Sequence, residues 1–428
     1  MKHIAIILWL AILLFAGISF TSCVKDSGFK KTKKFTPVFS TSEQVRASIK
    51  SDAAEDVAHP GKLFVMGNYI FLNEAGRGVH IIDNTNPSAP VNKAFIHIPG
   101  NGDISVKENI LYADCFTDLM AIDISDPNNV KLKNVIPNIF PDRQWVMGYQ
   151  VTGNTIITDW VTTDTTIDIT VSENNGIWKD GSYYAPIYYS VNDVFFYALA
   201  PNASSSSPSK GMAGSMSRFA LMNDYLYAVT FSKLNVIDVR ESPDPKWMKT
   251  VDLGNSIETI FPYKNKLFIG ASNGMQIYDA SNPASPSKLG SFGHVTSCDP
   301  VIADDKYAFV TLYAGSTCGG NMNQLHVLDI KDLTQPVEIK SYDLTNPKGL
   351  SKDGNYLFIC DGIDGLRVFD ASDVKNIKLI KRVEIPDAVD VISFNNIAIV
   401  AGSDGLYQCD YSDINNTHII SKITLRKN

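Results

Sequence analysis

The chain has 428 residues, of which 44% are apolar and 19% are charged, and its formal net charge is −7. This apolar content is sufficient for a hydrophobic core and excludes global disorder. The acidic balance argues against a general nucleic-acid-binding protein, which needs a basic surface for phosphate groups. The one long apolar run lies at the N-terminus, so a polytopic membrane protein is excluded as well.

The N-terminus has the pattern of a secretory signal, which we assign to residues 1–22. Lys2 and His3 precede an apolar stretch from Ile4 to Phe20, and Thr21-Ser22-Cys23 follows. A basic end, a short apolar segment and small residues are typical of such a signal. The cysteine after the small residues resembles that of a bacterial lipoprotein signal, and the resemblance implies that Cys23 carries the lipid. A plain secretory signal with an incidental cysteine is the alternative.

Residues 23–56 are interpreted as a basic tether with a short helix. Residues 1–50 hold eight Lys or Arg and two Asp or Glu, a net charge of +6, so the remainder of the chain carries −13. A basic segment of this kind either lies against anionic headgroups or is a solvated linker. Within it, Thr41-Ser42-Glu43-Gln44 offers a capping box for a helix over Val45 to Ile49.

The residues after Cys23 bear on the destination of the protein. Val24 follows the cysteine, and by resemblance to the sorting pattern of enteric bacterial lipoproteins this disfavours retention at the inner membrane. The next residues, Lys25-Asp26, resemble surface-export signals of Bacteroidetes lipoproteins. Together they lead us to expect an outer-membrane lipoprotein that is exposed at the cell surface.

A repeat organises most of the remaining chain. Runs of alternating apolar residues that end in Asp recur, and successive Asp residues are 40, 115, 41, 50, 41 and 40 positions apart. One weak copy, Phe195-Phe196-Tyr197-Ala198, divides the long gap and brings the number of copies to eight. The other seven copies end at Asp83, Asp123, Asp238, Asp279, Asp329, Asp370 and Asp410.

Each copy contains four short apolar runs, and turns such as Asn273-Gly274, Asp364-Gly365 and Asp404-Gly405 connect them. A unit of four strands cannot bury both of its faces alone, so neighbouring units stack. The sequence therefore predicts an all-β fold, a β-propeller of eight four-stranded blades over residues 57–425, with seven blades as the alternative. We expect each repeated Asp to accept backbone N–H groups of the following turn.

The alternating strand followed by Asp-Ile-Ser-Asp-Pro at residues 123–127 resembles the LVIVD repeat of bacterial envelope β-propellers. The resemblance extends over residues 57–425. It implies a role in binding or scaffolding and says little about any reaction. The repeats leave open whether the first and last blades simply abut or whether Phe35 to Phe39 adds a strand that locks the ring.

An insertion over residues 162–192 is the most individual feature of the chain. It is interpreted as a long β-hairpin that extends the second and third strands of its blade. Aromatic residues with a polar tip are enriched where proteins contact partners or sugars. Packing of these rings on the insertion itself or on the propeller rim is the alternative. The candidate partner-binding residues are Trp178, Tyr183, Tyr184, Tyr188 and Tyr189.

The six cysteines include one expected disulfide. Cys298 and Cys318 fall in two loops that share one face of a propeller, and disulfides persist in the oxidising compartments that exported proteins enter. We therefore predict a Cys298–Cys318 bridge. Cys115 and Cys360 are expected to be free, and Cys409 occupies a core-facing position. The chain has no CxxC motif, so a zinc site or a redox motif has no support.

The mouth of the central channel is a second candidate site. Aligning the repeats places residues of both charge signs where the first strand of each blade begins. This arrangement either holds a polar ligand, or a divalent cation such as Ca²⁺ bound by carboxylates, or forms a solvated, salt-bridged funnel. No other cofactor is expected. The candidate residues are Asp103, Arg143, Trp145, Arg218, Glu258, Asp299, Lys348 and Asp390.

The sequence offers no credible catalytic motif. One Gly-x-Ser-x-Gly match, at residues 270–274, runs into a strand and is interpreted as a turn, because a nucleophile elbow is followed by a helix. We therefore expect a lipid-anchored cell-surface propeller that binds an envelope protein or a glycan without catalysis and does not bind nucleic acid. The alternative is an envelope hydrolase or lyase with a metal-assisted site at the channel mouth.

Overall fold

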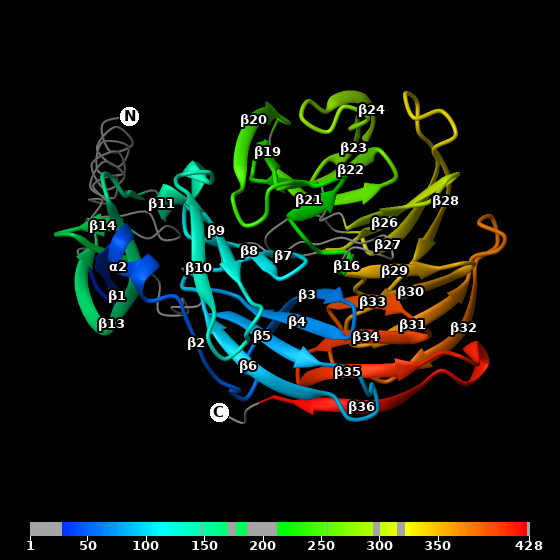
Figure 1. Ribbon diagram of the computed structural model, residues 1–428, viewed down its shortest axis with the longest axis horizontal. Helices are drawn as coiled ribbons and strands as arrows, with labels where there is room; N and C mark the ends of the chain where they lie inside the picture. Colours follow the sequence, from blue (N-terminus) through cyan, green and yellow to red (C-terminus); the bar gives the residue numbers. More distant parts are fainter. Residues whose placement is uncertain are drawn as a thin grey trace, which may run out of the picture. The chain divides into compact units, whose positions relative to one another are not determined.

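The computed structural model describes residues 28–146, 149–169, 177–185, 212–254, 256–293, 300–314 and 322–425. These residues are mainly β-strand, with one α-helix and two short 3-10 helices, η1 (Pro141–Gln144) and η2 (Ile414–Asn416). The chain divides into two compact units, one of Met1–Val38 and Asp159–Asp193, and one of Phe39–Thr158 and Val194–Asn428. Eight sheets in the described residues contain four or more strands (Figure 1). The expected all-β fold is confirmed with eight such sheets, and in the described residues seven of them are blades of the ring, the number that sequence analysis offered as the alternative.

Seven of these sheets are meanders of consecutive strands, and we call them blades 1 to 7. Each copy of the repeat that ends in Asp supplies the third strand of one blade. Blade 1 contains β3 (Pro60–Met66), β4 (Tyr69–Glu74), β5 (Gly78–Asp83) and β6 (Val91–His97). Blade 2 contains β7 (Ile104–Lys107), β8 (Ile110–Cys115), β9 (Asp118–Asp123) and β10 (Lys131–Ile136). Blade 3 contains β17 (Phe219–Met222), β18 (Tyr225–Val229), β19 (Lys233–Asp238) and β20 (Lys246–Asp252).

The remaining four blades follow in the same way. Blade 4 contains β21 (Ile257–Tyr263), β22 (Lys266–Ala271), β23 (Gly274–Asp279) and β24 (Ser287–Gly293). Blade 5 contains β25 (Val301–Ala303), β26 (Tyr307–Leu312), β27 (Gln324–Asp329) and β28 (Val337–Asp343). Blade 6 contains β29 (Leu350–Asp353), β30 (Tyr356–Cys360), β31 (Leu366–Asp370) and β32 (Lys378–Val383). Blade 7 contains β33 (Asp390–Phe394), β34 (Ile397–Gly402), β35 (Gly405–Asp410) and β36 (His418–Thr424).

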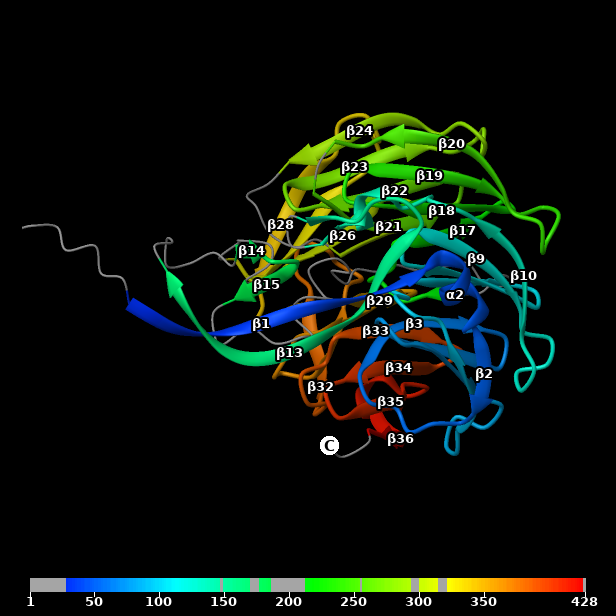
Figure 2. The same ribbon diagram turned by 90° about the vertical axis from the view of Figure 1, so that its left-hand side faces the viewer.

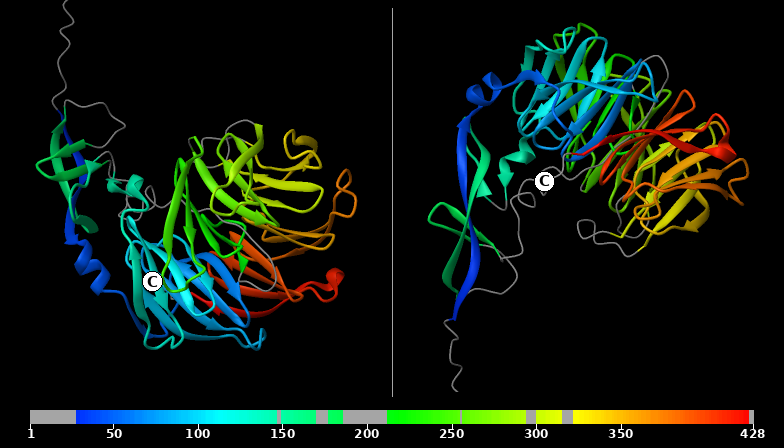
Figure 3. Two further views of the ribbon diagram at one scale, coloured as in Figure 1. Left: turned by 45° about the horizontal axis from the view of Figure 1, so that its top comes forward. Right: turned by 90° about the horizontal axis from the view of Figure 1, so that it is seen from below.

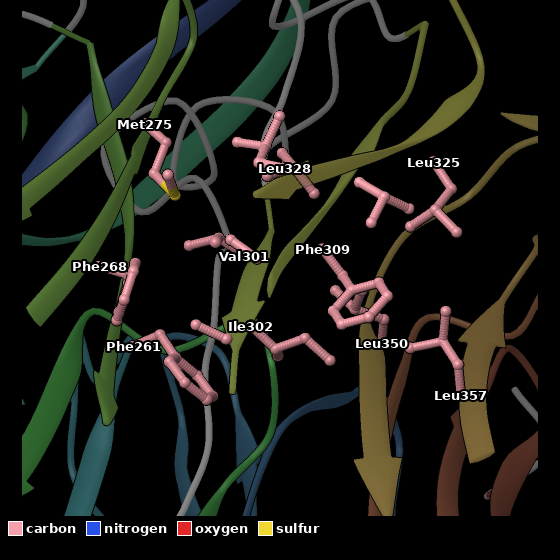
Figure 4. Packing of buried hydrophobic residues seen from close by; sticks show 14 of the residues in the cluster. Phe261, Phe268, Met275, Val301, Ile302, Phe309, Leu325, Leu328, Leu350 and Leu357 are labelled. Carbon is pink, nitrogen blue, oxygen red and sulfur yellow. The ribbon is translucent and has the colours of Figure 1, made fainter. Parts of the chain in front are cut away.

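Apolar clusters lie between successive blades all the way round the series. Figure 4 shows the cluster of blades 4 to 6, in which Phe268, Phe309 and Leu357 are buried. The second strand of a blade is buried on both faces, as the pattern of β8 shows. Burial on both faces is what stacking of neighbouring sheets produces.

The last blade packs directly against the first. Leu63 of blade 1 and Ile399 of blade 7 belong to one buried cluster, and Ser421 Oγ donates to the carbonyl of Pro87 at 2.6 Å. The red strands β35 and β36 accordingly lie beside the blue strands of blade 1 (Figures 1 and 3). The ring therefore closes by abutment, which is the first of the two possibilities that the repeats left open.

The repeated Asp of each blade caps the turn that follows it. In all seven copies a carboxylate Oδ1 accepts the backbone N–H two residues later, at 2.7 to 3.0 Å. In blade 2 the hydrogen bonds from Ser125 lower the pKa of Asp123 to about 2. The expectation that this Asp satisfies turn amides is confirmed, and the recurrence of the residue has a structural explanation.

The N-terminal segment is more structured than a tether. Residues 28–41 form β1 (Gly28–Thr41), and α2 (Ser42–Ala47) follows with the expected capping box, in which Thr41 and Gln44 bond each other's backbone N–H groups. After the helix, β2 (Lys50–Ala53) pairs antiparallel with β6 and adds a fifth strand to the outer edge of blade 1. Sequence analysis predicted the helix but neither strand pairing.

The eighth sheet has the order β13-β1-β15-β14, from β13 (Thr155–Ile169), β14 (Ile177–Lys179) and β15 (Ser182–Ala185). Figure 2 shows β1 and β13 side by side. The insertion was interpreted as a hairpin whose two arms pair with each other, and the structure differs because β1 lies between them. Phe35 of β1 explains the difference, since its buried ring contacts both Trp160 and Tyr183.

Several sequence predictions lie outside the described residues. They are the signal over residues 1–22 with Cys23, the weak copy at 195–198, and the Cys298–Cys318 bridge. Within the described part of the chain, Cys115, Cys360 and Cys409 are buried and free, as expected. From Gly28 onward, no helix of the described residues has the length and apolar character needed to cross a membrane.

We expect Phe309→Ala to destabilise the protein by about 3–5 kcal/mol, because the fully buried ring fills the space between blades and its removal leaves a cavity. Leu379→Ala is the matched control, since this side chain is 49% exposed on an outer strand, and its effect should stay below about 0.5 kcal/mol. Urea unfolding followed by circular dichroism measures both changes. Equal midpoints for the two variants would contradict the stacked-blade core.

Candidate functional site

Residues 212–218, which we call the axial segment, lie against the first strands of several blades. Strand β16 (Met212–Ala213) pairs with β3 of blade 1, and the N–H of Gly214 donates to the carbonyl of Leu63 at 2.9 Å. Ser217 accepts the N–H of Ile260 of blade 4 through its carbonyl at 3.2 Å. In Figure 1, β16 lies close to β3, β21 and β29.

Further contacts of the axial segment reach three more blades. The hydroxyl of Ser215, which is fully buried, accepts the N–H of Leu350 of blade 6. The hydroxyl of Ser217 donates to Asp103 Oδ1 of blade 2 at 2.5 Å, and the backbone of Gly214 lies against the carboxyl group of Asp390 of blade 7. One segment that contacts the first strands of five blades occupies the centre of the ring.

Asp103 is the hub of the charged groups around this segment. It is 1% exposed and directly precedes β7. Its Oδ2 atom receives the ammonium group of Lys62 at 2.6 Å and the backbone N–H of Arg218, and its Oδ1 atom receives the N–H of Ile104 at 2.8 Å. Burial lowers the pKa of Lys62, and the Asp103 carboxylate opposes this effect. A buried carboxylate is tolerable only when its hydrogen-bonding capacity is satisfied, and both oxygens of Asp103 accept hydrogen bonds.

A second buried carboxylate fixes the loop before β7. Asp114 Oδ1 accepts the N–H groups of Gly102 and Asp103 at 2.6 and 2.9 Å, and the side chain of Asn101 at 2.8 Å. Its Oδ2 atom lies 2.6 Å from the guanidinium of Arg143, which also stacks on the ring of Phe140. Arg143, predicted as a channel-mouth ligand, is thus held in an internal contact.

Asp390 differs from the other central carboxyl groups. It begins β33, is 1% exposed, and accepts the N–H of Val391 at 2.9 Å. Burial raises the pKa of Asp390 to about 8, even though Lys62 and the hydrogen bond with Val391 act in the opposite direction. Gly214 and Gly349 lie so close to the carboxyl group that a Cβ atom at either position would collide with it. At neutral pH this carboxyl group is therefore mainly protonated.

The remaining predicted mouth residues have varied surroundings. Burial lowers the pKa of Arg218, and the neighbouring charge of Arg143 adds to this effect while Glu258 opposes it. Lys348 forms a surface ion pair with Asp387 at 2.8 Å. Asp299 and the side chain of Trp145 lie outside the described part of the structure. The fold brings Asp103, Arg218 and Asp390 to one place and leaves Lys348 apart.

Sequence reasoning missed Lys62, Ser215 and Ser217. Lys62 lies within the first strand of blade 1, where an alternating pattern gives no reason to expect a buried charge. The run of small residues Ala213-Gly214-Ser215 was a usable signal, because only small residues permit close approach of two backbones. Among the described residues, no group of three His, Cys, Asp or Glu side chains is arranged to hold a metal ion.

The aromatic residues of the insertion make contact with one another. Tyr183 is buried and its ring centroid lies 5.6 Å from that of Trp178, which in turn lies 5.8 Å from Trp160. These rings form a small core in their sheet, the arrangement that sequence analysis set against a partner-binding role. Tyr184 pairs with Lys34 and is partly exposed, whereas Tyr188 and Tyr189 lie outside the described residues.

The closed series of four-stranded blades around an axis defines the protein as a β-propeller. A model of the LVIVD repeat matches residues 59–95, 101–136, 263–293, 301–344 and 348–384, which fall in blades 1, 2, 4, 5 and 6. Five blades of the chain therefore carry the LVIVD repeat. No curated protein matches it.

The chain is also similar to several solved structures. A protein from Lactobacillus plantarum has 10% identity and a TM-score of 0.49, over 84% of this chain and 98% of its own. A protein described as functionally unknown from Desulfotomaculum acetoxidans has 10% identity and a TM-score of 0.48, over 85% of this chain and 95% of its own. A chain of a mitotic checkpoint complex has 11% identity and a TM-score of 0.49, over 82% of this chain and 88% of its own.

We expect Asp390→Asn to change how stability depends on pH. The folded protein keeps the Asp390 proton up to about pH 8, whereas the unfolded chain loses it near the usual pKa of 3.8. The unfolded state therefore binds fewer protons between these values, and this group lowers the free energy of unfolding as pH rises, by at most about 1.4 kcal/mol per pH unit. The amide of the variant does not titrate, so the variant gains stability relative to the wild type between pH 5 and pH 8.

Urea unfolding at pH 5, 6.5 and 8 measures this difference. Asp387→Asn is the control, because this carboxylate is on the surface and pairs with Lys348. Parallel pH profiles for the wild type and Asp390→Asn would show that Asp390 is ionised in the folded protein.

Proposed function

We propose that the protein is a lipid-anchored envelope propeller that binds a protein or glycan partner through its surface loops and carries out no reaction. The observation that supports this proposal is the axial segment. The chain's own residues 212–218 occupy the centre of the ring, and the buried charged groups Lys62 and Asp103 are engaged with each other. Ligand binding is therefore assigned to the outer surface of the blades rather than to an open channel.

One face of the ring presents exposed apolar side chains on its hairpins. Phe231, between β18 and β19, is 54% exposed, and Ile363, between β30 and β31, is 77% exposed. Every blade is a meander, so the hairpins between second and third strands all project on the same face. Large apolar side chains that are exposed on loops are common anchors for partner proteins.

The signal sequence expected at the N-terminus supports a location in the cell envelope. The basic end, the apolar stretch and Cys23 resemble a lipoprotein signal, and the following residues resemble those of surface-exported lipoproteins. A lipid at Cys23 with the basic residues that follow would supply two membrane-binding elements, which together give more stable anchoring than one.

The anchor is tested with Cys23→Ser. We expect the wild-type protein to fractionate with outer membranes and to incorporate labelled palmitate, and the variant to lose the label and appear in soluble fractions. Cys360→Ser, at a buried free cysteine, controls for loss of a thiol. Membrane association of Cys23→Ser equal to that of the wild type would contradict lipid anchoring.

Partner binding is tested by affinity capture from solubilised envelopes and by a glycan array. We expect the protein to enrich a discrete envelope component, and the double variant Phe231→Ser/Ile363→Ser to retain roughly a tenth of it, since anchors at interfaces contribute most of the affinity. Val337→Ser is the matched control, because Val337 is 62% exposed on an outer strand away from the hairpins. No specific capture by either method would contradict a binding role.

A further inference from the structure

A shallow pocket of about 410 Å³ lies between blades 6 and 7. It is formed by the turn between β29 and β30, by the turn between β33 and β34, and by the loop that follows β35. These turns lie on the face opposite the hairpins that carry Phe231 and Ile363. The lining residues are Asp353, Gly354, Asn355, Tyr356, Asn396, Tyr411, Ser412, Asp413 and Ile414.

The lining is rich in acceptors and aromatic groups. It includes the carboxylates of Asp353 and Asp413 and the rings of Tyr356 and Tyr411, and it contains no Lys, Arg or His. A positively charged group is attracted by carboxylates and by the faces of aromatic rings alike. The pocket therefore favours a cation over an anion or an apolar group.

Tyr411 fixes the position of the first carboxylate. It is 4% exposed, its ring lies 4.7 Å from that of Phe358, and its hydroxyl donates to Asp353 Oδ2 at 2.9 Å. Burial raises the pKa of Tyr411, and the Asp353 carboxylate adds to this effect. The hydroxyl thus remains a donor, and Asp353 Oδ1 has no hydrogen-bond partner among the residues that the structure describes.

The interface between blades 5 and 6 contains an ion pair that Asp353 lacks at the interface between blades 6 and 7. Asp304 of blade 5 lies opposite Tyr307, as Asp353 of blade 6 lies opposite Tyr356, so the two Asp residues are equivalent in the repeat. Asp304 receives the ammonium group of Lys352, from the next blade, at 3.0 Å.

The residue of blade 7 that corresponds to Lys352 is Ser393, which binds the hydroxyl of Ser351 instead. The position following the repeated Asp also differs, since it is Tyr411 in blade 7 and Ala371 in blade 6. At the interface of blades 6 and 7 the fold thus keeps the carboxylate but not the lysine that neutralises it. An external cation completes the arrangement that Lys352 completes one blade earlier.

The geometry points to a binding site for the ammonium or guanidinium group of a Lys or Arg side chain on a partner protein. The charged group pairs with Asp353 Oδ1 and with Asp413, and the ring of Tyr356 covers its carbon stem or its π face. This inference goes beyond the proposed function, because it adds a second binding surface on the face opposite Phe231 and Ile363 and names a basic peptide as its partner chemistry.

The test uses saturation-transfer NMR with the purified protein and three tripeptides blocked at both ends, Gly-Arg-Gly, Gly-Lys-Gly and Gly-Gln-Gly. We expect the two basic peptides to bind and the glutamine peptide not to bind. Asp353→Asn should weaken binding about tenfold, as expected when a charge-assisted hydrogen bond is lost. Asp304→Asn is the matched control and should leave binding unchanged, because Asp304 is already occupied by Lys352.

Two results would overturn the inference. One is equal binding of the glutamine and arginine peptides, and the other is equal loss of binding in Asp353→Asn and Asp304→Asn. Saturation transfer from a neutral oligosaccharide that Asp353→Asn abolishes, without transfer from the basic peptides, would assign the pocket to a sugar instead. Envelope capture that persists while the peptides fail to bind would remove this pocket and leave the proposed function intact.

Discussion

Everything in this fold depends on the burial of two apolar faces on each four-stranded sheet. A sheet such as β7–β10, whose second strand is buried at every position, would expose apolar side chains to water if it had only one neighbour. Stacking satisfies both faces of an interior blade but leaves one face at each end of a linear series. Contact between blades 7 and 1 removes these ends, and the shared cluster around Leu63 and Ile399 is where that happens. The short turns capped by the repeated Asp keep each blade's strands in register for this packing.

Closure of the ring also brings the first strands together at its centre. Polar groups there are removed from water and are costly unless they find hydrogen-bond partners. Here the chain fills that space with its own axial segment, and polar groups of different blades pair with one another or with the segment. Lys62 of blade 1 pairs with Asp103 of blade 2, and Ser217 and Ser215 of the segment bond Asp103 and the backbone of Leu350. A polar centre built in this way specifies which blades meet which part of the segment, since any slip would leave buried charges without partners. The surface is then the part of the molecule available for recognition.

The features that recur in every repeat could be predicted from the sequence, whereas the features that occur once in the chain could not. Alternation and the Asp-terminated strands predicted the blades and the turn capping, because both follow from local residue patterns. The capping box predicted a short helix, expected over Val45 to Ile49 and found at Ser42–Ala47. The pairing of β1 with β15 and of β2 with β6 depends on contacts between distant segments, and no local pattern encodes them. Aligning the repeats placed Asp103, Arg218 and Asp390 near the starts of first strands, where they lie in the structure, but gave no reason to place Lys62 or residues 212–218 beside them. Asp353 was also missed, because its significance lies in the absence of a lysine at position 393, which appears only when two blade interfaces are compared in space.

The position of the axial segment in the chain constrains the order of assembly. The segment precedes blade 3, yet it contacts Leu350 of blade 6 and Asp390 of blade 7, which ribosomes synthesise more than a hundred residues later. A nascent chain that ends after blade 5 therefore lacks two of the five blades that contact the axial segment. The axial segment is synthesised before blades 6 and 7, so these blades complete the ring around a segment that the chain already contains. The centre of this propeller is therefore filled as the ring closes and not afterwards.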